Sequence, residues 1–202
     1  MPDITSGYDT LILVAVLAYL LGSIPFGIVI TRAMGLGDLR KIGSGNIGAT
    51  NVLRTGNKPA ALATLILDAG KGGIAVLVAR YFAAEDAAQL AGLASFLGHL
   101  FPVWLNFKGG KGVATFLGIL LALAWPVGLA TCATWVVVAA ISRISSLAAL
   151  FAAALSSVWL VVFGEGRMIV LVVILTLLVY LRHAENLARI KAGTEPRIGK
   201  KK

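Results

Sequence analysis

The chain has 202 residues, of which 58% are hydrophobic and 13% charged, and its mean hydropathy is +0.90. This composition excludes a soluble globular domain and predicts an all-α integral membrane protein. The formal net charge is +9. Because such a chain has little soluble surface to grip a duplex, we expect no nucleic acid partner. The positive charge is expected to set topology and to meet anionic lipid headgroups or substrates.

Apolar runs long enough to span a bilayer follow one another along the chain. The first covers residues 10–31 and contains GSIPFG at 22–27, which predicts a kink. Runs at 59–79, 87–105, 144–164 and 168–188 follow, and the last becomes polar at its end. Residues 112–142 carry no charge and are too many for one span, so Trp125-Pro126 near their middle predicts two short helices. We therefore expect seven transmembrane helices, several short or kinked, in one membrane-embedded domain, 1–202.

Lysine and arginine residues orient these helices. Of the 18 in the chain, only Arg80 and Arg167 fall outside when the N-terminus is outside, and Lys71 falls within a helix. The remaining basic residues, including the Lys200–Lys202 tail, then lie on the cytoplasmic side. The outer connections are acidic instead, with Asp3, Asp9, Glu85, Asp86 and Glu165. The bias predicts an outside N-terminus, a cytoplasmic C-terminus and cytoplasmic glycine-rich loops.

The first candidate site is the small, polar and uncharged run GSGNIGATN at residues 43–51. Glycines allow successive backbone N–H groups to point into one concavity, and such a nest binds anions. Arg54 can add a bidentate clamp on phosphate. A flexible basic linker is the alternative. The candidate residues are Gly43, Ser44, Gly45, Asn46, Thr50, Asn51 and Arg54.

Asp68 and Lys71 form a second candidate, inside the helix expected at 59–79. Charges within a membrane are costly and usually face a partner or a cavity. Their spacing of three places both on one helix face, where they can neutralise each other. A structural ion pair and a direct contact of Lys71 with substrate both stay open.

A third candidate joins His99 to the turn Lys108-Gly109-Gly110-Lys111. The turn lacks the spacing and the hydroxyl residue of a P-loop, so nucleotide binding is rejected. Two lysines on a glycine hinge can still reach phosphate oxygens. Lysines that snorkel at the membrane edge and a histidine that only packs are the alternatives.

The fourth candidate lies at the end of the last predicted helix. One continuous helix would place His183 on a face with Asn186, and Arg182, Asn186 and Arg189 on a face as well. A positive helix cap at the inner leaflet explains the arginines, but it explains His183 and Asn186 poorly.

Several catalytic patterns are missing from the sequence. There is no Gly-x-Ser-x-Gly elbow, and no His is followed four residues later by Asp. Two histidines without a carboxylate cluster disfavour a metal site, and we expect no cofactor. The single cysteine, Cys132, is expected to pack in a core or face lipid.

Taken together, these pieces resemble the bacterial acyl-phosphate:glycerol-3-phosphate acyltransferase family, the PlsY family. The matching segments are 22–27, 43–51, 68–72, 98–114 and 182–189, with Gly193 and Glu195 following. The resemblance implies a seven-helix, multi-pass enzyme of the bacterial inner membrane with its active site on the cytoplasmic side. It would move a fatty acyl group from acyl phosphate to the 1-hydroxyl of glycerol 3-phosphate, as the first step of phospholipid synthesis. The products would be lysophosphatidic acid and phosphate.

Acyl phosphate carries a good leaving group already, so orientation and charge stabilisation can replace a covalent nucleophile. We assign the 43–51 run to a phosphate, and Arg54, Lys111, His183 and Asn186 to glycerol 3-phosphate. The catalytic candidates are Ser44, His99 and Lys111. The proton acceptor stays open between His99 and the departing phosphate. A covalent route through a Ser44 acyl-enzyme is a third alternative, less favoured because the sequence shows no adjacent base. An organophosphate transporter and a non-catalytic lipid-binding scaffold are the alternative functions, and the oligomeric state is not predicted.

Overall fold

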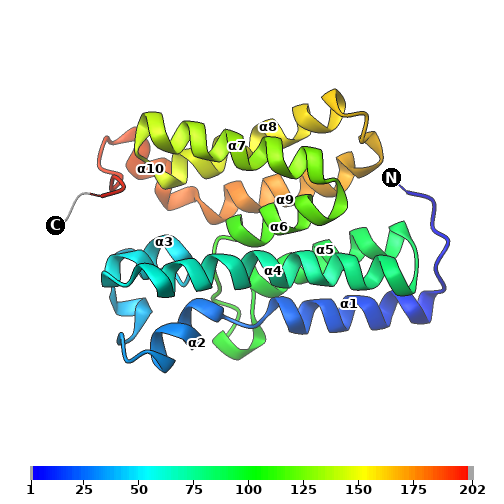
Figure 1. Ribbon diagram of the computed structural model, residues 1–202, viewed down its shortest axis with the longest axis horizontal. Helices are drawn as coiled ribbons and strands as arrows, with labels where there is room; N and C mark the ends of the chain where they lie inside the picture. The colour runs from blue at the N-terminus through cyan, green and yellow to red at the C-terminus, as the bar shows by residue number, and fades with distance from the viewer. Residues whose placement is uncertain (1, 200–202) are drawn as a thin grey trace. The chain divides into compact units, whose positions relative to one another are not determined.

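A computed structural model describes residues 2–199, and the predicted Lys200–Lys202 tail lies outside this range. The regular elements among these residues are all helical (Figure 1). Contacts divide the chain into two compact units, one from Pro2 to Leu123 and one that begins at Ala124. Each unit is described by itself.

The unit Pro2–Leu123 holds six α-helices and three single 3₁₀ turns. The helices are α1 (Tyr8–Gly22), α2 (Phe26–Ala33), α3 (Ala49–Val52), α4 (Lys58–Phe82), α5 (Glu85–Leu100) and α6 (Val113–Leu123). The 3₁₀ turns are Leu39–Lys41, Leu53–Thr55 and Val103–Leu105. The kink predicted at 22–27 is confirmed, because α1 ends at Gly22 and Pro25 directly precedes α2.

Small residues bring the helices of this unit close together. A Cβ added at Gly22 would lie 2.6 Å from Ser95 Cα, and one added at Gly98 would lie 2.8 Å from Ser23 N, so α1 and α5 cross with their backbones nearly touching. A Cβ added at Gly118 would lie 2.9 Å from Ala69 Cα in α4. Close backbone approach through small residues is how membrane helices gain packing energy without a hydrophobic driving force.

Helix length places the connection between α5 and α6 part-way along α4. The helices α4, α5 and α6 have 25, 16 and 11 residues. At about 1.5 Å per residue they extend roughly 38, 24 and 16 Å. Asn57 starts α4 by accepting a hydrogen bond from Ala60 N at 3.0 Å. The longer α4 therefore passes beside the α5–α6 connection in its interior, where Asp68 and Lys71 lie.

The second unit contains α7 (Trp125–Ser142), α8 (Ser145–Val162), α9 (Ile169–Arg182) and α10 (Ala184–Lys191). The predicted division of residues 112–142 is confirmed, because α6 ends at Leu123 and α7 begins at Trp125 with proline in its first turn. A polar bond joins α7 to α8, from Trp159 Nε1 to Thr134 Oγ1 at 3.0 Å. Thr176 of α9 likewise donates to the carbonyl of Ala153 in α8 at 3.0 Å.

The expectation of one continuous helix over 168–188 is wrong. The chain bends by 61° between α9 and α10, and His183 is the residue at the bend. Arg182 therefore ends α9 and does not share a helix face with Asn186 and Arg189. The sequence change from apolar to charged residues marks this place, but hydropathy alone does not reveal a turn.

Five helical segments within residues 2–199 are long and apolar enough to cross a membrane, and the bent pair α9–α10 makes a sixth. The apolar helix α6 is shorter, with 11 residues. The protein is thus a multi-pass membrane protein by length and composition. The predicted count of seven requires α6 to act as a short span.

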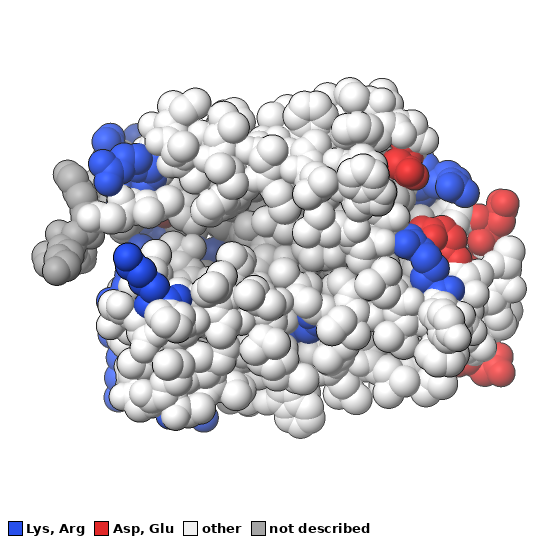
Figure 2. Space-filling view, viewed as in Figure 1, with Lys and Arg blue, Asp and Glu red and all other residues white. Residues whose placement is uncertain are grey.

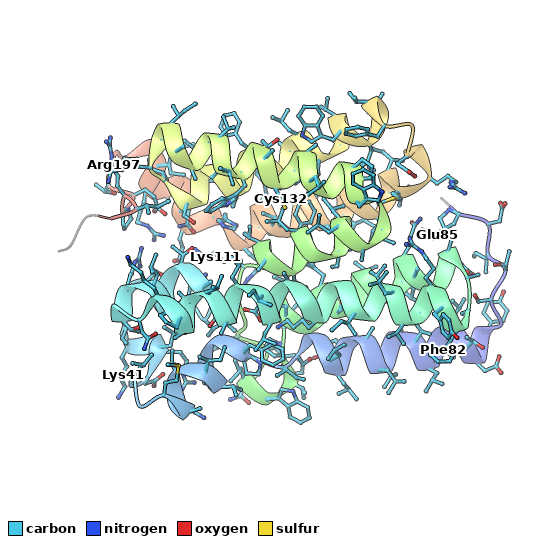
Figure 3. The ribbon with its side chains drawn as sticks, in the orientation of Figure 1. Lys41, Phe82, Glu85, Lys111, Cys132 and Arg197 are labelled. Atoms are coloured by element: carbon cyan, nitrogen blue, oxygen red, sulfur yellow. The ribbon has the colours of Figure 1, made fainter. Side chains whose placement is uncertain are left out.

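Charge is sorted along each unit by itself (Figure 2). In the unit Pro2–Leu123, basic residues gather at the end formed by α2 and α3, and acidic residues gather where α4 turns into α5. Figure 3 shows Lys41 at the first end and Phe82 with Glu85 at the other. One end of this unit is therefore basic, whereas the other end carries acidic residues together with Arg80, which pairs with Glu85 at 3.0 Å.

Candidate functional site

The loop 43–51 folds around the buried side chain of Asn51. Asn51 Nδ2 donates to the carbonyls of Leu39 and Ile42, at 3.0 and 2.9 Å. Its Oδ1 accepts from the backbone N–H of Ser44 at 3.2 Å and from Arg54 Nη1 at 3.3 Å. Asn51 is 2% exposed. The residue was predicted to touch phosphate, but these bonds go to Ser44 within the loop and to residues on either side of it, which fits a role in shaping the loop.

Glycine conformation turns this loop. Gly43 and Gly45 have φ values of 55° and 69°, in the left-handed region that favours glycine. Gly45 N donates to the carbonyl of Ile42 at 2.9 Å, which closes a tight turn. Ser44 at the tip is exposed, whereas Ile47 is buried and anchors the loop in an apolar cluster.

The remaining predicted residues of this loop are accessible to a ligand. Gly43, Thr50 and Arg54 are exposed, and Gly45 and Asn46 are half-buried. The Arg54 guanidinium is held beside the loop by its bond to Asn51 Oδ1. The loop thus presents a hydroxyl, a cation and small backbone segments on one surface, which is a chemistry suited to phosphate.

Asp68, Lys71 and His99 form a buried cluster in the same unit. Lys71 Nζ lies 2.8 Å from Asp68 Oδ1 and donates to the carbonyl of Ile24 at 2.8 Å. His99 Nδ1 lies 3.7 Å from the same carboxylate oxygen. The three side chains are between 1% and 4% exposed. These contacts support the structural alternative for Lys71, which was also a candidate for substrate contact.

The glycine turn after α5 covers His99. Gly109 N donates to the carbonyl of Leu100 at 3.0 Å, and Gly110 N donates to the carbonyl of His99 at 3.1 Å. A Cβ added at Gly110 would overlap His99 Nε2. Only glycine lets this backbone lie against the imidazole, which explains why glycines separate Lys108 from Lys111.

The two lysines of the turn differ in exposure. Lys108 is exposed, and Lys111 is half-buried just before α6 (Figure 3). Asn106 and Phe107 precede them with φ values of 50° and 60°, and such backbone is uncommon outside glycine. The chain therefore accepts local strain to reverse direction here, which is typical of functional turns.

The second unit holds Ser146, Asn186 and Arg189 around the carboxylate of Glu195. Glu195 Oε1 accepts hydrogen bonds from Asn186 Nδ2 at 2.5 Å and from Ser146 Oγ at 2.7 Å. Its Oε2 accepts from Arg189 Nε at 2.7 Å. Burial raises the pKa of Glu195, but these hydrogen bonds lower it by more, so the pKa lies below its usual value.

This cluster changes what the predicted residues can do. The charge of Arg189 is balanced by Glu195, so its candidate role in phosphate binding gives way to holding the segment after α10. His183 is 3% exposed and its Nδ1 lies 2.8 Å from the carbonyl of Val179. The sequence analysis assigned no role to Glu195 or Ser146. The two residues are 49 positions apart, and no local pattern in the sequence links them.

This helical, multi-pass membrane protein carries an exposed polar loop suited to phosphate and a buried imidazole, His99, in its first unit. Its second unit carries a buried imidazole, His183, and a buried amide, Asn186. Comparison with known proteins assigns the class. The family model described as glycerol-3-phosphate acyltransferase matches residues 12–193. The chain belongs to the glycerol-3-phosphate acyltransferase family, and it is an acyltransferase.

Individual relatives agree over the full length. A glycerol-3-phosphate acyltransferase of Cereibacter sphaeroides is 71% identical over 201 residues, which cover 100% of this chain and 96% of the relative. The solved structure of PlsY, described as an integral membrane glycerol 3-phosphate acyltransferase in its glycerol 3-phosphate form, is 40% identical with a TM-score of 0.89. It covers 94% of this chain and 96% of its own chain.

A second PlsY structure, described as the lysophosphatidic acid form, is 38% identical with a TM-score of 0.87 and covers 94% of this chain and 95% of its own. The predicted resemblance to the PlsY family is therefore confirmed. The family assignment decides against the transporter and scaffold alternatives.

Proposed function

We propose that this protein transfers a fatty acyl group from acyl phosphate to the 1-hydroxyl of glycerol 3-phosphate. The hydroxyl oxygen of glycerol 3-phosphate forms the C–O bond of the new ester as the bond between the acyl carbon and the phosphate oxygen breaks. The hydroxyl proton passes to His99 or to the departing phosphate. The products are 1-acyl-glycerol 3-phosphate, which is lysophosphatidic acid, and inorganic phosphate. This reaction is the first step of bacterial phospholipid synthesis.

The observation that carries the proposal is the pair of PlsY structures, whose descriptions name glycerol 3-phosphate and lysophosphatidic acid. These two compounds differ by one acyl group, so they are an acceptor and its product. An activated acyl donor completes the balance. The cationic and polar groups of this chain favour a donor that carries phosphate, because Ser44, Thr50 and Arg54 are exposed on one loop.

The proposed roles follow the exposure of each group. The hydroxyl groups of Ser44 and Thr50 bind the phosphate of the acyl donor, and Asn51 shapes the loop by accepting from the N–H of Ser44. In the first unit the exposed Arg54 and the half-buried Lys111 bind glycerol 3-phosphate, and Lys108 adds positive charge near the membrane surface. For His183 and Asn186, which are buried in the second unit, the same role is proposed from the sequence alone. His99 and the departing phosphate remain the two candidates for the proton acceptor. A Ser44 acyl-enzyme is less favoured because the Ser44 hydroxyl faces an amide oxygen, Asn51 Oδ1 at 3.5 Å, rather than a base.

We further propose that residues 1–202 act as one membrane-embedded domain in the bacterial inner membrane, with the N-terminus outside. In this proposal the five long segments, the bent pair and the shorter α6 each cross the membrane once, which makes seven crossings. The basic ends would face the cytoplasm and place the site there. The family match supports one functional domain, because residues 12–193 include both compact units.

The decisive experiment uses the full-length protein purified in detergent. Palmitoyl phosphate and glycerol 3-phosphate are added, and released phosphate and lysophosphatidate are both measured. We expect one phosphate for each lysophosphatidate formed. Palmitoyl coenzyme A in place of palmitoyl phosphate should give no product, and product formed from it alone would refute the proposed donor.

Ser44→Ala tests the phosphate-binding loop. Loss of one donor should raise the KM for acyl phosphate or lower kcat, by on the order of 10-fold to 100-fold. Ser157→Ala is the matched control, because the Ser157 hydroxyl donates to the carbonyl of Ala154 within its own helix, at 2.9 Å. Equal kinetics for both variants would remove the loop from the mechanism.

His99→Ala separates the proton acceptors. If His99 accepts the proton, kcat at saturating substrate should fall by on the order of 100-fold or more. A substantial kcat with a raised KM would instead favour the phosphate group of the substrate as the acceptor.

A further inference from the structure

The carboxylate of Asp68 lies between a lysine and a histidine in the interior of the first unit. Asp68 is 2% exposed, and its Oδ1 is 2.8 Å from Lys71 Nζ and 3.7 Å from His99 Nδ1. A buried ion pair is a poor source of stability, because desolvation of the two charges offsets most of their attraction. Three ionisable residues gathered inside a membrane protein therefore call for a functional explanation.

The backbone of Asp68 and the ammonium group of its partner Lys71 are both fixed by residues outside α4. Lys71 Nζ also donates to the carbonyl of Ile24, in the break between α1 and α2. Thr115 Oγ1 of α6 donates to the carbonyl of Asp68 at 2.9 Å. The first span thus anchors the ammonium group that pairs with the Asp68 carboxylate, and α6 anchors the backbone of Asp68, all within the unit Pro2–Leu123. Asp68 and Lys71 are therefore restrained by two further hydrogen bonds that an isolated i,i+3 ion pair would not have.

The imidazole of His99 meets different chemistry at its two nitrogen atoms. Nδ1 faces the Asp68 carboxylate, and Nε2 faces the backbone of Gly110 in the glycine turn. At 3.7 Å the contact between Nδ1 and the carboxylate is electrostatic rather than a hydrogen bond. A negative charge beside Nδ1 favours a proton on that nitrogen, which leaves the Nε2 lone pair directed to the other side. Nε2 thus faces Gly110, and Lys111 is the next residue in the chain.

We propose that Asp68 is a positioning residue for His99. Its carboxylate, locked by Lys71, orients the imidazole and keeps the proton on Nδ1, so that Nε2 is presented unprotonated toward the glycine turn. The inference rests on the proposed function in one respect, namely that His99 acts on the substrates. Asp68 and Lys71 themselves touch no substrate in this arrangement.

The first test is the tautomer of His99 without substrate. The full-length protein contains two histidines, so ¹⁵N-histidine labelling gives two sets of imidazole signals, and His183→Gln assigns them. Above the pH at which imidazole is charged, we expect His99 to carry its proton on Nδ1. A proton on Nε2 in the unmodified protein would overturn the proposal, whatever the activity of the enzyme.

The second test compares two buried aspartates. Asp68→Asn should remove the Nδ1–H preference and lower kcat about 10-fold to 100-fold, while KM for both substrates changes less than about threefold. Asp86→Asn is the matched control. Asp86 is 8% exposed and accepts hydrogen bonds from Ser6 N and Ser6 Oγ, at 2.9 and 2.8 Å, away from His99.

The outcomes separate the two proposals. If Asp86→Asn keeps the kcat and the tautomer, and Asp68→Asn loses both, the positioning role is supported. A folded Asp68→Asn protein with unchanged tautomer and unchanged kcat refutes it. If the Asp68→Asn protein does not fold, the tautomer of the unmodified protein still decides. If that tautomer is as expected but palmitoyl phosphate gives no product, the proposed function fails and the positioning geometry stands.

Discussion

Gly110→Ala gives the most direct test of the geometry around His99. The added Cβ would overlap Nε2 of the imidazole and lie 2.9 Å from Cε1, whereas ordinary contacts begin at 3.4 Å. The ring or the turn must therefore move by at least about half an ångström to relieve Cε1, and by more to relieve Nε2. The backbone conformation of Gly110 is open to alanine, because its φ does not lie in the left-handed region. Steric contact with His99 is thus the perturbation.

A displacement of about 1 Å at a reacting group can cost on the order of 100-fold in rate. We expect kcat of Gly110→Ala to fall by roughly that factor, and stability to fall by about 1–3 kcal/mol from overpacking. The assay is the release of phosphate by the purified protein at saturating palmitoyl phosphate and glycerol 3-phosphate, with the melting temperature measured in parallel.

Gly70→Ala is the control. A Cβ added at Gly70 would meet no atom within 4 Å, and alanine is favoured over glycine in a helix interior by about 1 kcal/mol. This variant should keep its kcat and melt at the same or a higher temperature. If Gly110→Ala folds and turns over within twofold of the unmodified enzyme, the inferred contact between the turn and His99 has no catalytic consequence.

Three further predictions concern stability. Gly98→Ala should lower the melting temperature by several degrees, because its Cβ would meet the backbone carbonyl of Tyr19 in the neighbouring helix. Arg80→Met should also lower it while KM is retained, because Arg80 Nη2 donates to the carbonyl of Leu123 at 3.1 Å and so holds the end of α6. The third prediction is acid sensitivity at Glu195, whose folded-state pKa is lowered from 4.5. Its stabilising contribution is complete above that pH and is lost as the pH falls through the lower folded value. Glu195→Gln should reduce the fall in melting temperature that the unmodified protein shows as the pH drops below 4.5. An unchanged dependence of the melting temperature on pH would contradict the role assigned to the hydrogen bonds of Glu195.

The sequence predicted where several helices begin and end, because local residues set these boundaries. Pro25 and Pro126 mark a break and a start, and long apolar runs mark the spans. The predicted kink and the division of residues 112–142 are confirmed for this reason. The bend at His183 was missed, because the residues on both sides of it are compatible with helix and only a change in direction separates them.

The sequence predicted which residues carry suitable chemical groups, but it did not predict what each residue contacts. Asn51 was predicted beside phosphate because amides bind anions, yet its amide satisfies the carbonyls of Leu39 and Ile42. Lys71 was readable as a partner of Asp68 because the two are three residues apart on one helix. Its bond to the carbonyl of Ile24 spans 47 residues, and no pattern in the sequence encodes a contact at that separation.

The sequence by itself determined a basic, multi-pass helical membrane protein and its resemblance to an acyltransferase family. Composition, proline position and glycine-rich polar segments act over a few residues, so they can be read directly. Only the tertiary structure decided that Asp68 and His99, 31 positions apart, share a buried contact, and that Glu195 gathers Ser146, Asn186 and Arg189. Those arrangements depend on how α4 packs beside α5 and how the chain folds back after α10, and close packing of whole helices sets both.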